Sequence, residues 1–326
     1  MFHWIADACG LPLNENTSAS VRNCPNATSQ FWIVSCSEIF MSSSESLPPL
    51  CWNRMDIEQR LYGGGCRFTG VNMFRTSIVG LLLSVLFYLP LIAFPKLTIS
   101  QMFLERGSTP YAIVFLSAWA SVALIIKGQK LALQRRCLLE EYRVVPANPS
   151  FILAASTVEV VMNNIHRTVD DPRHFVLFNR IQIALSNLRN LGRVGDVEDI
   201  LRAQGGHDES SVETSYSVIN AFVWAIPVLG FIGTVLGLSQ AISQFGGVLQ
   251  GAGEMDAIKT SLQGVTAGLA TAFETTLEAL VAALLIQLRL AFLKKAEEEF
   301  LDECTEYCTR NVVNKLRIMV FERDGE

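Results

Sequence analysis

The sequence predicts an all-α membrane protein, with four transmembrane helices and a helical cytoplasmic segment between the second and the third. Half of its 326 residues are hydrophobic and 17% are charged, whereas soluble domains average about 25% charged residues. Residues 214–253 carry no formal charge. Because about 20 helical residues cross the hydrocarbon layer of a bilayer, this run is long enough to span a membrane.

Three other apolar stretches complete the predicted set of spans. Residues 76–95 and 107–126 contain no charged side chain, and residues 262–288 contain only the carboxylates Glu274 and Glu278. Each stretch has the length of one crossing. We therefore divide the chain into an N-terminal cysteine-containing region (1–70), spans one and two (71–127), a cytoplasmic segment (128–215), spans three and four (216–292), and a C-terminal cytoplasmic helix and tail (293–326).

Lysine and arginine residues indicate how the spans are oriented. Positive residues near span ends favour the cytoplasmic side. Here they precede span one and follow spans two and four (Arg67, Arg75, Lys127, Lys130, Arg135, Arg136, Arg289, Lys294 and Lys295). Both termini and residues 128–215 are therefore predicted to be cytoplasmic. The net charge is −5 and the sequence has no basic block, so nucleic acid is not an expected partner.

The cytoplasmic parts are predicted to be mostly helical. Residues 151–169 and 175–191 alternate apolar and polar side chains at helical spacing. Asp170-Asp171-Pro172 lies between them and is typical of a turn that caps the second helix. Gly205-Gly206-His207-Asp208 predicts a further break before span three. Beyond span four, residues 294–320 are expected to extend the last helix out of the membrane.

Residues 1–70 show no lasting helical or strand periodicity and hold five cysteines: Cys9, Cys24, Cys36, Cys51 and Cys66. Their spacings match no paired zinc-binding pattern. In a reducing cytoplasm free thiols are expected. The alternative is a disulfide framework outside the cell, which would need an inverted or three-span topology.

Small residues mark one face of span three. Gly230, Gly233, Thr234 and Gly237 recur at helical spacing after Pro227, so they share one side of a helix. Because lipid gives no hydrophobic drive for helix association, close packing of small faces has to supply it. We predict that this face forms a seam against another helix, with Thr234 as its polar point.

The fourth span carries a similar face together with polar side chains. That face is lined at helical spacing by Gly264, Gly268, Thr271, Thr275 and Glu278. Thr276 lies about 100° away from it around the helix. Each threonine is open to two interpretations, helix packing or a polar pathway. An ionisable side chain at a helix centre costs about 2.5–3.5 kcal/mol on insertion scales, and normally faces a pathway or a partner. We expect a functional or water-facing role for Glu278; the alternative is a buried, protonated structural carboxyl.

The sequence does not indicate an enzyme. Its four histidines lie outside the predicted spans and share no metal-ligand spacing (His3, His166, His174 and His207). It contains neither a glycine-rich phosphate loop nor a nucleophile motif. No catalytic residue, metal ion or cofactor is therefore predicted.

Two motifs resemble the MotA/TolQ/ExbB proton-channel family. Residues 225–237, AIPVLGFIGTVLG, match the family motif almost position by position, and residues 272–276, AFETT, align with its A-L-x-x-T stretch. The resemblance covers residues 215–290 well. It extends to the whole chain through the order of the spans, which is similar to the four-span MotA arrangement. It implies that Thr234 and Thr276 are the two pore threonines.

The chain departs from the family pattern at four positions. The glycine that usually follows the second threonine is Ala279, and the acidic residue that some relatives carry five positions before it is Thr271. Glu274 and Glu278 stand where relatives usually have apolar residues. The candidate ion pathway is Thr234, Thr271, Thr275, Thr276, Glu274 and Glu278, and the candidate packing residues are Pro227, Gly230, Gly233, Gly237, Gly264 and Gly268.

The resemblance also implies partners and a mechanism. In this family a pentameric ring of the wide subunit surrounds two copies of a single-span subunit (MotB, TolR or ExbD), each with an essential aspartate, in the bacterial inner membrane. Protons, or sodium ions in some members, cross between that aspartate and the threonines and drive mechanical work. The chain is thus expected to be a lipid-embedded channel subunit of an ion-driven motor, without a cofactor. The alternative is a non-transporting membrane scaffold or receptor.

The two carboxylates of span four lead to a separate expectation. Glu274 and Glu278 are four residues apart, so their side chains are neighbours on the helix surface. Two carboxyls in a poorly hydrated pore do not both ionise readily, and at least one is expected to be protonated at neutral pH. Glu278 would then relay protons toward the partner's aspartate. The alternative role for Glu274 is to concentrate cations at a water-facing mouth.

Overall fold

The computed structural model describes residues 50–316, with the exception of residues 105, 149–150, 155, 192–193 and 251–254. In this part the chain forms α1 (Trp52–Met55), α2 (Ile57–Tyr62), α3 (Met73–Ala93), α4 (Thr98–Leu104), α5 (Thr109–Arg135), α6 (Val158–Thr168), α7 (Val176–Leu191), α8 (Val194–Gln250) and α9 (Met255–Asn311). Short 3₁₀ turns lie at Arg136–Leu138, Glu140–Tyr142, Pro172–His174 and Val313–Lys315. Cys9, Cys24 and Cys36 lie outside the described residues, and Cys51 and Cys66 are free thiols.

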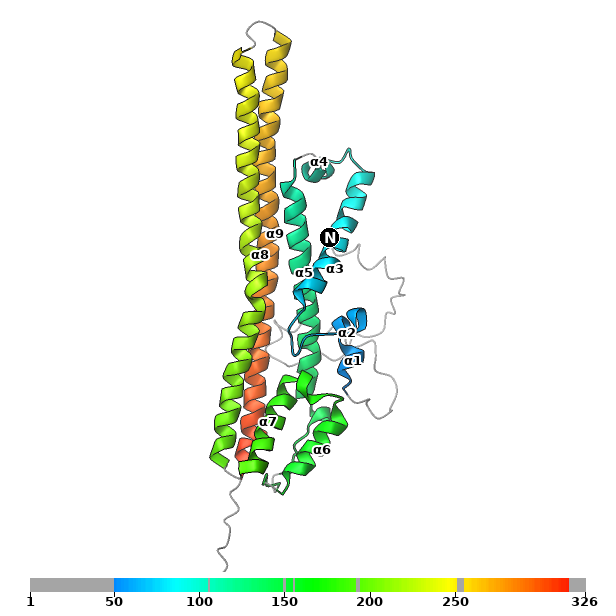
Figure 1. The fold of residues 1–326 in the computed structure, drawn as a ribbon, viewed down its shortest axis with the longest axis vertical. Helices are drawn as coiled ribbons and strands as arrows, with labels where there is room; N and C mark the ends of the chain where they lie inside the picture. Colours follow the sequence, from blue (N-terminus) through cyan, green and yellow to red (C-terminus); the bar gives the residue numbers. More distant parts are fainter. Residues whose placement is uncertain are drawn as a thin grey trace, which may run out of the picture. The chain divides into compact units, whose positions relative to one another are not determined.

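Four helices are long and apolar enough to cross a membrane: Met73–Ala93, Thr109–Leu138, Asp196–Gly246 and Leu262–Lys315. They correspond to α3, α5, α8 and α9, so for the residues that the structure describes the prediction of a helical fold with four candidate spans is confirmed. In Figure 1, α8 and α9 run side by side as a long hairpin, α5 packs beside them, and α3 packs against α5. Spans three and four are therefore parts of helices that continue well beyond the apolar segments.

The second span lies inside the subunit rather than at its edge. Half of the most apolar stretch of α5 is buried (50%), against 17% for α3. A methyl group added at Gly80 of α3 would lie 2.8 Å from the Trp119 Cα of α5, so these two backbones approach closely. The Trp119 Nε1–H also donates to the Thr76 hydroxyl at 3.1 Å. Of the first two spans, α3 is the more exposed within the subunit.

The glycines predicted to form a packing seam lie at the contact between two helices of the same chain, α8 and α9. A Cβ added at Gly230 would lie 2.5 Å from the Ala279 Cβ, and one added at Gly237 would lie 2.7 Å from the Gly268 carbonyl oxygen. A Cβ added at Gly264 would lie 3.0 Å from the Gln244 side chain of α8. The small faces of α8 and α9 are thus pressed against each other, and they do not border an open channel within the subunit.

The predicted break at Gly205-Gly206-His207-Asp208 is wrong, because α8 runs through it without interruption. Two glycines inside a helix cost about 1 kcal/mol each relative to alanine. Packing offsets that cost, since Val197 lies fully within the hydrophobic core that α8 shares with α6, α7 and α9. Asp208 also pairs with Arg180 of α7, with 2.6 Å between the Arg180 Nε and the Asp208 carboxylate. Tertiary contacts therefore override the local preference for a turn.

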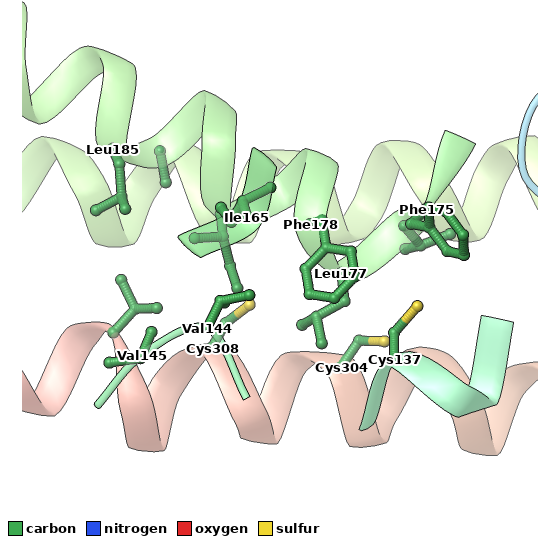
Figure 2. Packing of buried hydrophobic residues seen from close by; sticks show 14 of the residues in the cluster. Cys137, Val144, Val145, Ile165, Phe175, Leu177, Phe178, Leu185, Cys304 and Cys308 are labelled. Atoms are coloured by element: carbon green, nitrogen blue, oxygen red, sulfur yellow. The ribbon is translucent and has the colours of Figure 1, made fainter. Parts of the chain in front are cut away.

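A separate hydrophobic core holds together the end of the bundle formed by α6, α7 and the last part of α9. Figure 2 shows Phe178 of α7 and Ile165 of α6 facing Cys304 and Cys308 of α9, with Cys137 from the 3₁₀ turn that follows α5. The predicted helices over 151–169 and 175–191 begin later than expected, at residues 158 and 176. The turn between them is confirmed, because the Asp171 carboxylate caps the Arg173 amide at 2.9 Å. The predicted extension of the last helix is confirmed through residue 311.

The short N-terminal helices were not predicted, since neither is long enough to show a period. Asp170 anchors α1 by accepting a hydrogen bond from the Trp52 amide at 3.0 Å and one from the Cys51 thiol at 3.3 Å. Burial raises the pKa of Asp170, but hydrogen bonds from the backbone amides of Trp52 and Asp171 outweigh it and hold the pKa below its usual value. This contact therefore stabilises the fold at neutral pH and weakens as acid protonates the carboxylate.

Lys127 forms a buried network where α5 leaves the apolar region. Its ammonium lies 3.3 Å from the Glu297 carboxylate of α9 and donates to the Ser215 hydroxyl of α8 at 2.9 Å. The Tyr216 hydroxyl donates to the same carboxylate at 2.6 Å, and Thr69 bonds its other oxygen. A lysine that the sequence presents as an exposed cytoplasmic charge thus joins three helices and the N-terminal segment.

One turn further along α5, Lys130 makes a second buried group of ion pairs. Its ammonium contacts the Glu58 carboxylate, lies 3.7 Å from that of Asp56, and donates to the Gly70 carbonyl at 2.8 Å. The other Glu58 oxygen accepts from the Asn72 amide at 2.8 Å. These contacts fix residues 56–72 against the base of α5. Removing one partner from such a pair is costly, because it leaves an unpaired buried charge.

The close contact between α8 and α9 gives a direct test. Gly237→Ala is expected to lower the free energy of unfolding by about 1–3 kcal/mol, because its methyl group would overlap the backbone of α9. Gly206→Ala is the matched control, since nothing lies within 4 Å of the added methyl and helix propensity favours alanine by about 0.5–1 kcal/mol. Thermal unfolding of the purified chain in detergent measures both. Equal effects of the two substitutions would contradict the close packing.

Candidate functional site

Thr234 and Thr276 lie next to the closest point of the α8–α9 contact. The Thr276 hydroxyl donates to the Gly230 carbonyl of α8 at 3.2 Å and to the Ala272 carbonyl of its own helix at 3.1 Å. The Thr234 hydroxyl donates to the Phe231 carbonyl at 2.6 Å. Both side chains are half-buried. Each hydroxyl therefore uses its proton within the helix pair and keeps oxygen lone pairs free to accept.

The two threonines lie on the same side of the helix pair. Gly233 and Thr275 face each other across the seam, and Thr234 and Thr276 each follow by one position, a rotation of about 100°. The two helices are antiparallel, so equal rotations about their own axes turn both side chains toward the same side. The arrangement brings the two residues that the family motif singles out into one neighbourhood, from positions 42 residues apart in the sequence.

Thr275 and Thr271 have different surroundings. Thr275 is fully buried beneath Gly233, and its hydroxyl donates to the Thr271 carbonyl at 2.9 Å. The Thr271 hydroxyl donates to the Ala267 carbonyl at 3.0 Å. Thr275 occupies the space that Gly233 leaves open, so it fills the seam between the helices. The packing interpretation holds for this threonine within the subunit.

Glu274 lies on the opposite side of α9 from Thr276 and is matched by a cation. The Arg106 guanidinium binds both carboxylate oxygens, through Nε at 2.6 Å and Nη2 at 3.2 Å. Arg106 comes from the connector between α4 and α5, so this ion pair ties the connector to the fourth span. The sequence does not reveal the pair, because the two residues are 168 positions apart.

Glu278 lies one helical turn beyond Glu274 and faces α5. Its side chain is 7% exposed, and neither carboxyl oxygen has a hydrogen-bond partner among the described residues. It lines a cavity with Ile113 and Ser117 of α5. Thus the candidate ion-pathway residues divide into a hydroxyl side, with Thr234 and Thr276, and a carboxyl side, with Glu274 and Glu278.

The glycines among the remaining candidate residues lie where the two long helices meet. Gly230, Gly233, Gly237, Gly264 and Gly268 all lie at the α8–α9 contact. Pro227 lies inside α8 without ending it; a proline removes one main-chain hydrogen bond at such a position. Among the described residues, no group of three or more histidine, cysteine or acidic side chains is placed to hold a metal ion.

These features define the class of the protein. It is a multi-pass helical membrane protein whose last two long helices pack through glycines and carry two hydroxyls beside the contact. Residues 172–306 match the MotA/TolQ/ExbB proton channel family, in agreement with the resemblance that the two motifs carry. The match covers α7, α8 and most of α9, and it is a family of channels rather than enzymes. No curated protein and no solved structure matches the chain.

The Arg106–Glu274 pair can be tested by a double-mutant cycle. Arg106→Gln and Glu274→Gln are each expected to lower the free energy of unfolding by about 1–3 kcal/mol, because each leaves a charged partner without its hydrogen bonds. The double variant should lose less than the sum of the single losses, since the two residues act as one unit. Thermal unfolding in detergent measures the cycle. Strictly additive losses would show that the two side chains do not interact.

Proposed function

We propose that this chain is the channel subunit of an ion-driven motor in the bacterial inner membrane. In this proposal five copies form a ring around two copies of a single-span partner, and ion flow is coupled to mechanical work through that partner. The transported ion is a proton, with sodium as the alternative. One observation carries the proposal: Thr234 and Thr276 lie on the same side of the α8–α9 seam, inside the segment that matches a proton channel family.

The hydroxyl side suits an ion path because its groups are small and hydrogen-bonding. A threonine oxygen accepts hydrogen bonds from water or from a hydrated proton. In a narrow space between subunits, these hydrogen bonds replace the ones that the ion loses when it leaves bulk water. Spans three and four contain no aspartate in their apolar parts. A mobile carboxylate therefore comes from the partner helix, or its role falls to Glu278.

The outer faces of the helix pair support an assembly with other helices. Large apolar side chains stand exposed on α8 and α9 within the apolar region, among them Trp224, Phe231 and Phe273. The small faces are already used within the chain, so contacts between copies have to involve these larger side chains. In the proposed ring, α8 and α9 face the centre and α3 faces lipid.

The pore assignment predicts the effect of removing each hydroxyl. Thr234→Val and Thr276→Val keep the side-chain volume but lose the hydrogen-bonding oxygen, and each is expected to reduce ion flux by about tenfold or more. Flux is measured in vesicles that contain the chain and its partner. Thr309→Val is the matched control, because its hydroxyl makes the same kind of bond within the helix, to the Thr305 carbonyl, near the cytoplasmic end of α9. Normal flux in both test variants would contradict the assignment.

The proton-relay hypothesis for Glu278 predicts a difference between two glutamates. Glu278→Gln keeps the shape and a hydrogen-bonding head but has no exchangeable acid proton, so proton flux is expected to fall. Glu274→Gln should conduct, because Arg106 already neutralises that carboxylate. The same vesicle assay compares the two variants at equal protein content. Unchanged flux in Glu278→Gln would leave this residue with a structural role.

A non-transporting scaffold or receptor is the second candidate. The observation that favours it is that both threonine hydroxyls are already bonded to main-chain carbonyls of the helix pair. In that case the polar groups only hold the helices together. The valine variants separate the two functions, because a scaffold loses no flux when a hydroxyl is removed.

A further inference from the structure

A cavity opens between the first two spans and the fourth, on the carboxyl side of α9. Its volume is about 730 Å³, within the range of sites that hold small molecules. The walls come from α3, α4, α5 and α9, and Figure 1 shows α4 joining the ends of α3 and α5. Nearly all lining side chains are apolar, and they include Leu83, Phe87, Phe103, Ile113 and Leu285.

Two polar side chains in this wall lack partners. Glu278 is more than nine-tenths buried, and both of its carboxyl oxygens are without a hydrogen bond. The Ser117 hydroxyl of α5, which lines the same cavity, is also buried and unpaired. Burial of a carboxylate without a partner is costly. The cavity wall therefore contains a carboxyl group, that of Glu278, for which the described part of the chain provides no hydrogen-bond donor.

The nearest cation of the subunit does not serve Glu278. Arg106 is committed to Glu274 through two hydrogen bonds. A carboxylate in apolar surroundings is best matched by a positively charged donor, because charge-assisted hydrogen bonds are the strong ones. The missing complement is thus a group such as an ammonium.

The rim of the cavity indicates where such a ligand comes from. Leu86 of α3 and Leu285 of α9 line the cavity and remain 60% and 63% exposed. Both lie in helices that cross the apolar layer. The opening therefore faces the hydrocarbon of the bilayer, so a ligand enters with an apolar chain first dissolved in lipid. A phospholipid head group would carry its phosphate toward Glu278 as well, and two negative charges would then oppose each other.

We propose that this cavity binds a single-chain lipophilic amine, whose ammonium pairs with Glu278 and whose chain lies along the apolar walls from α3, α4 and α5. The Ser117 hydroxyl supplies a further acceptor for the ammonium. The site is separate from the hydroxyl side of the helix pair, but it uses Glu278, so a bound amine would exclude the proton relay proposed for that residue. Binding itself is measured without an ion gradient. Its outcome is therefore independent of whether the chain conducts ions.

The test uses the full chain in nanodiscs of phosphatidylcholine and a dodecylamine with a photoreactive diazirine in its chain. After irradiation, peptide mass spectrometry should place the label on cavity walls of α5 and α9. Glu278→Gln is expected to lower labelling by about tenfold or more, through loss of the charge pair. Ala118→Phe fills the cavity, keeps Glu278, and should also abolish labelling. Glu298→Gln is the matched control, because it makes the same change at an exposed glutamate that does not line this cavity.

Competition with unlabelled ligands, measured on the chain without substitutions, tests whether the cavity recognises the positive charge of the amine. Dodecylamine should displace the label, whereas dodecanol and dodecanoate should displace it at least about tenfold less well. Equal displacement by dodecanol would overturn the proposal, because the carboxylate would not be recognising charge. Displacement by phosphatidylethanolamine in the disc would assign the cavity to a phospholipid and overturn it too. Labelling that persists in both Ala118→Phe and Glu278→Gln, or that spreads evenly over the exposed side of α3, would overturn the proposal. It would show that the probe only partitions into the membrane.

Discussion

The contact of two glycine faces along α8 and α9 determines most of this structure. Main-chain atoms of Gly237 and Gly268 approach so closely that a single methyl group does not fit between them. This approach fixes the rotation of each helix about its axis. As a result Thr234 and Thr276 point to one side of the pair, while Glu274 and Glu278 point to the side that α5 and the connector cover. The division of polar groups follows from backbone packing alone.

The extent to which the sequence predicts this arrangement depends on the range of each interaction. Charge-free runs and recurring glycines are local patterns, so they predict four helices and a small-residue face on span three. They do not say which helix meets that face, and the answer is another part of the same chain. The predicted helix break at Gly205-Gly206 fails for the opposite reason. The two glycines are a strong local signal for a turn, but the Arg180–Asp208 ion pair outweighs it.

The charged residues show a similar limit of sequence reasoning. In the sequence, Lys127 is one of the positive residues that predict the cytoplasmic side. In the structure its ammonium is buried against Glu297, 170 positions away. Arg106 weakens the charge asymmetry of the loops in the sequence, and in the structure it neutralises Glu274. Glu278 was recognisable as unusual because a carboxylate in a span is rare. Its orientation toward α5, and the cavity beside it, depend on contacts that no local pattern encodes.

The buried network around Lys127 has a consequence for how the protein is made. Lys127 and Thr69 emerge early in synthesis, while Glu297, which binds both, is among the last residues of the helical part to be translated. Until then the ammonium lacks its carboxylate, although the Ser215 hydroxyl of α8 has already been synthesised. The junction at the base of α5 can therefore close only after the fourth span has been inserted. Nascent chains that stop short of residue 297 leave this lysine without its carboxylate partner.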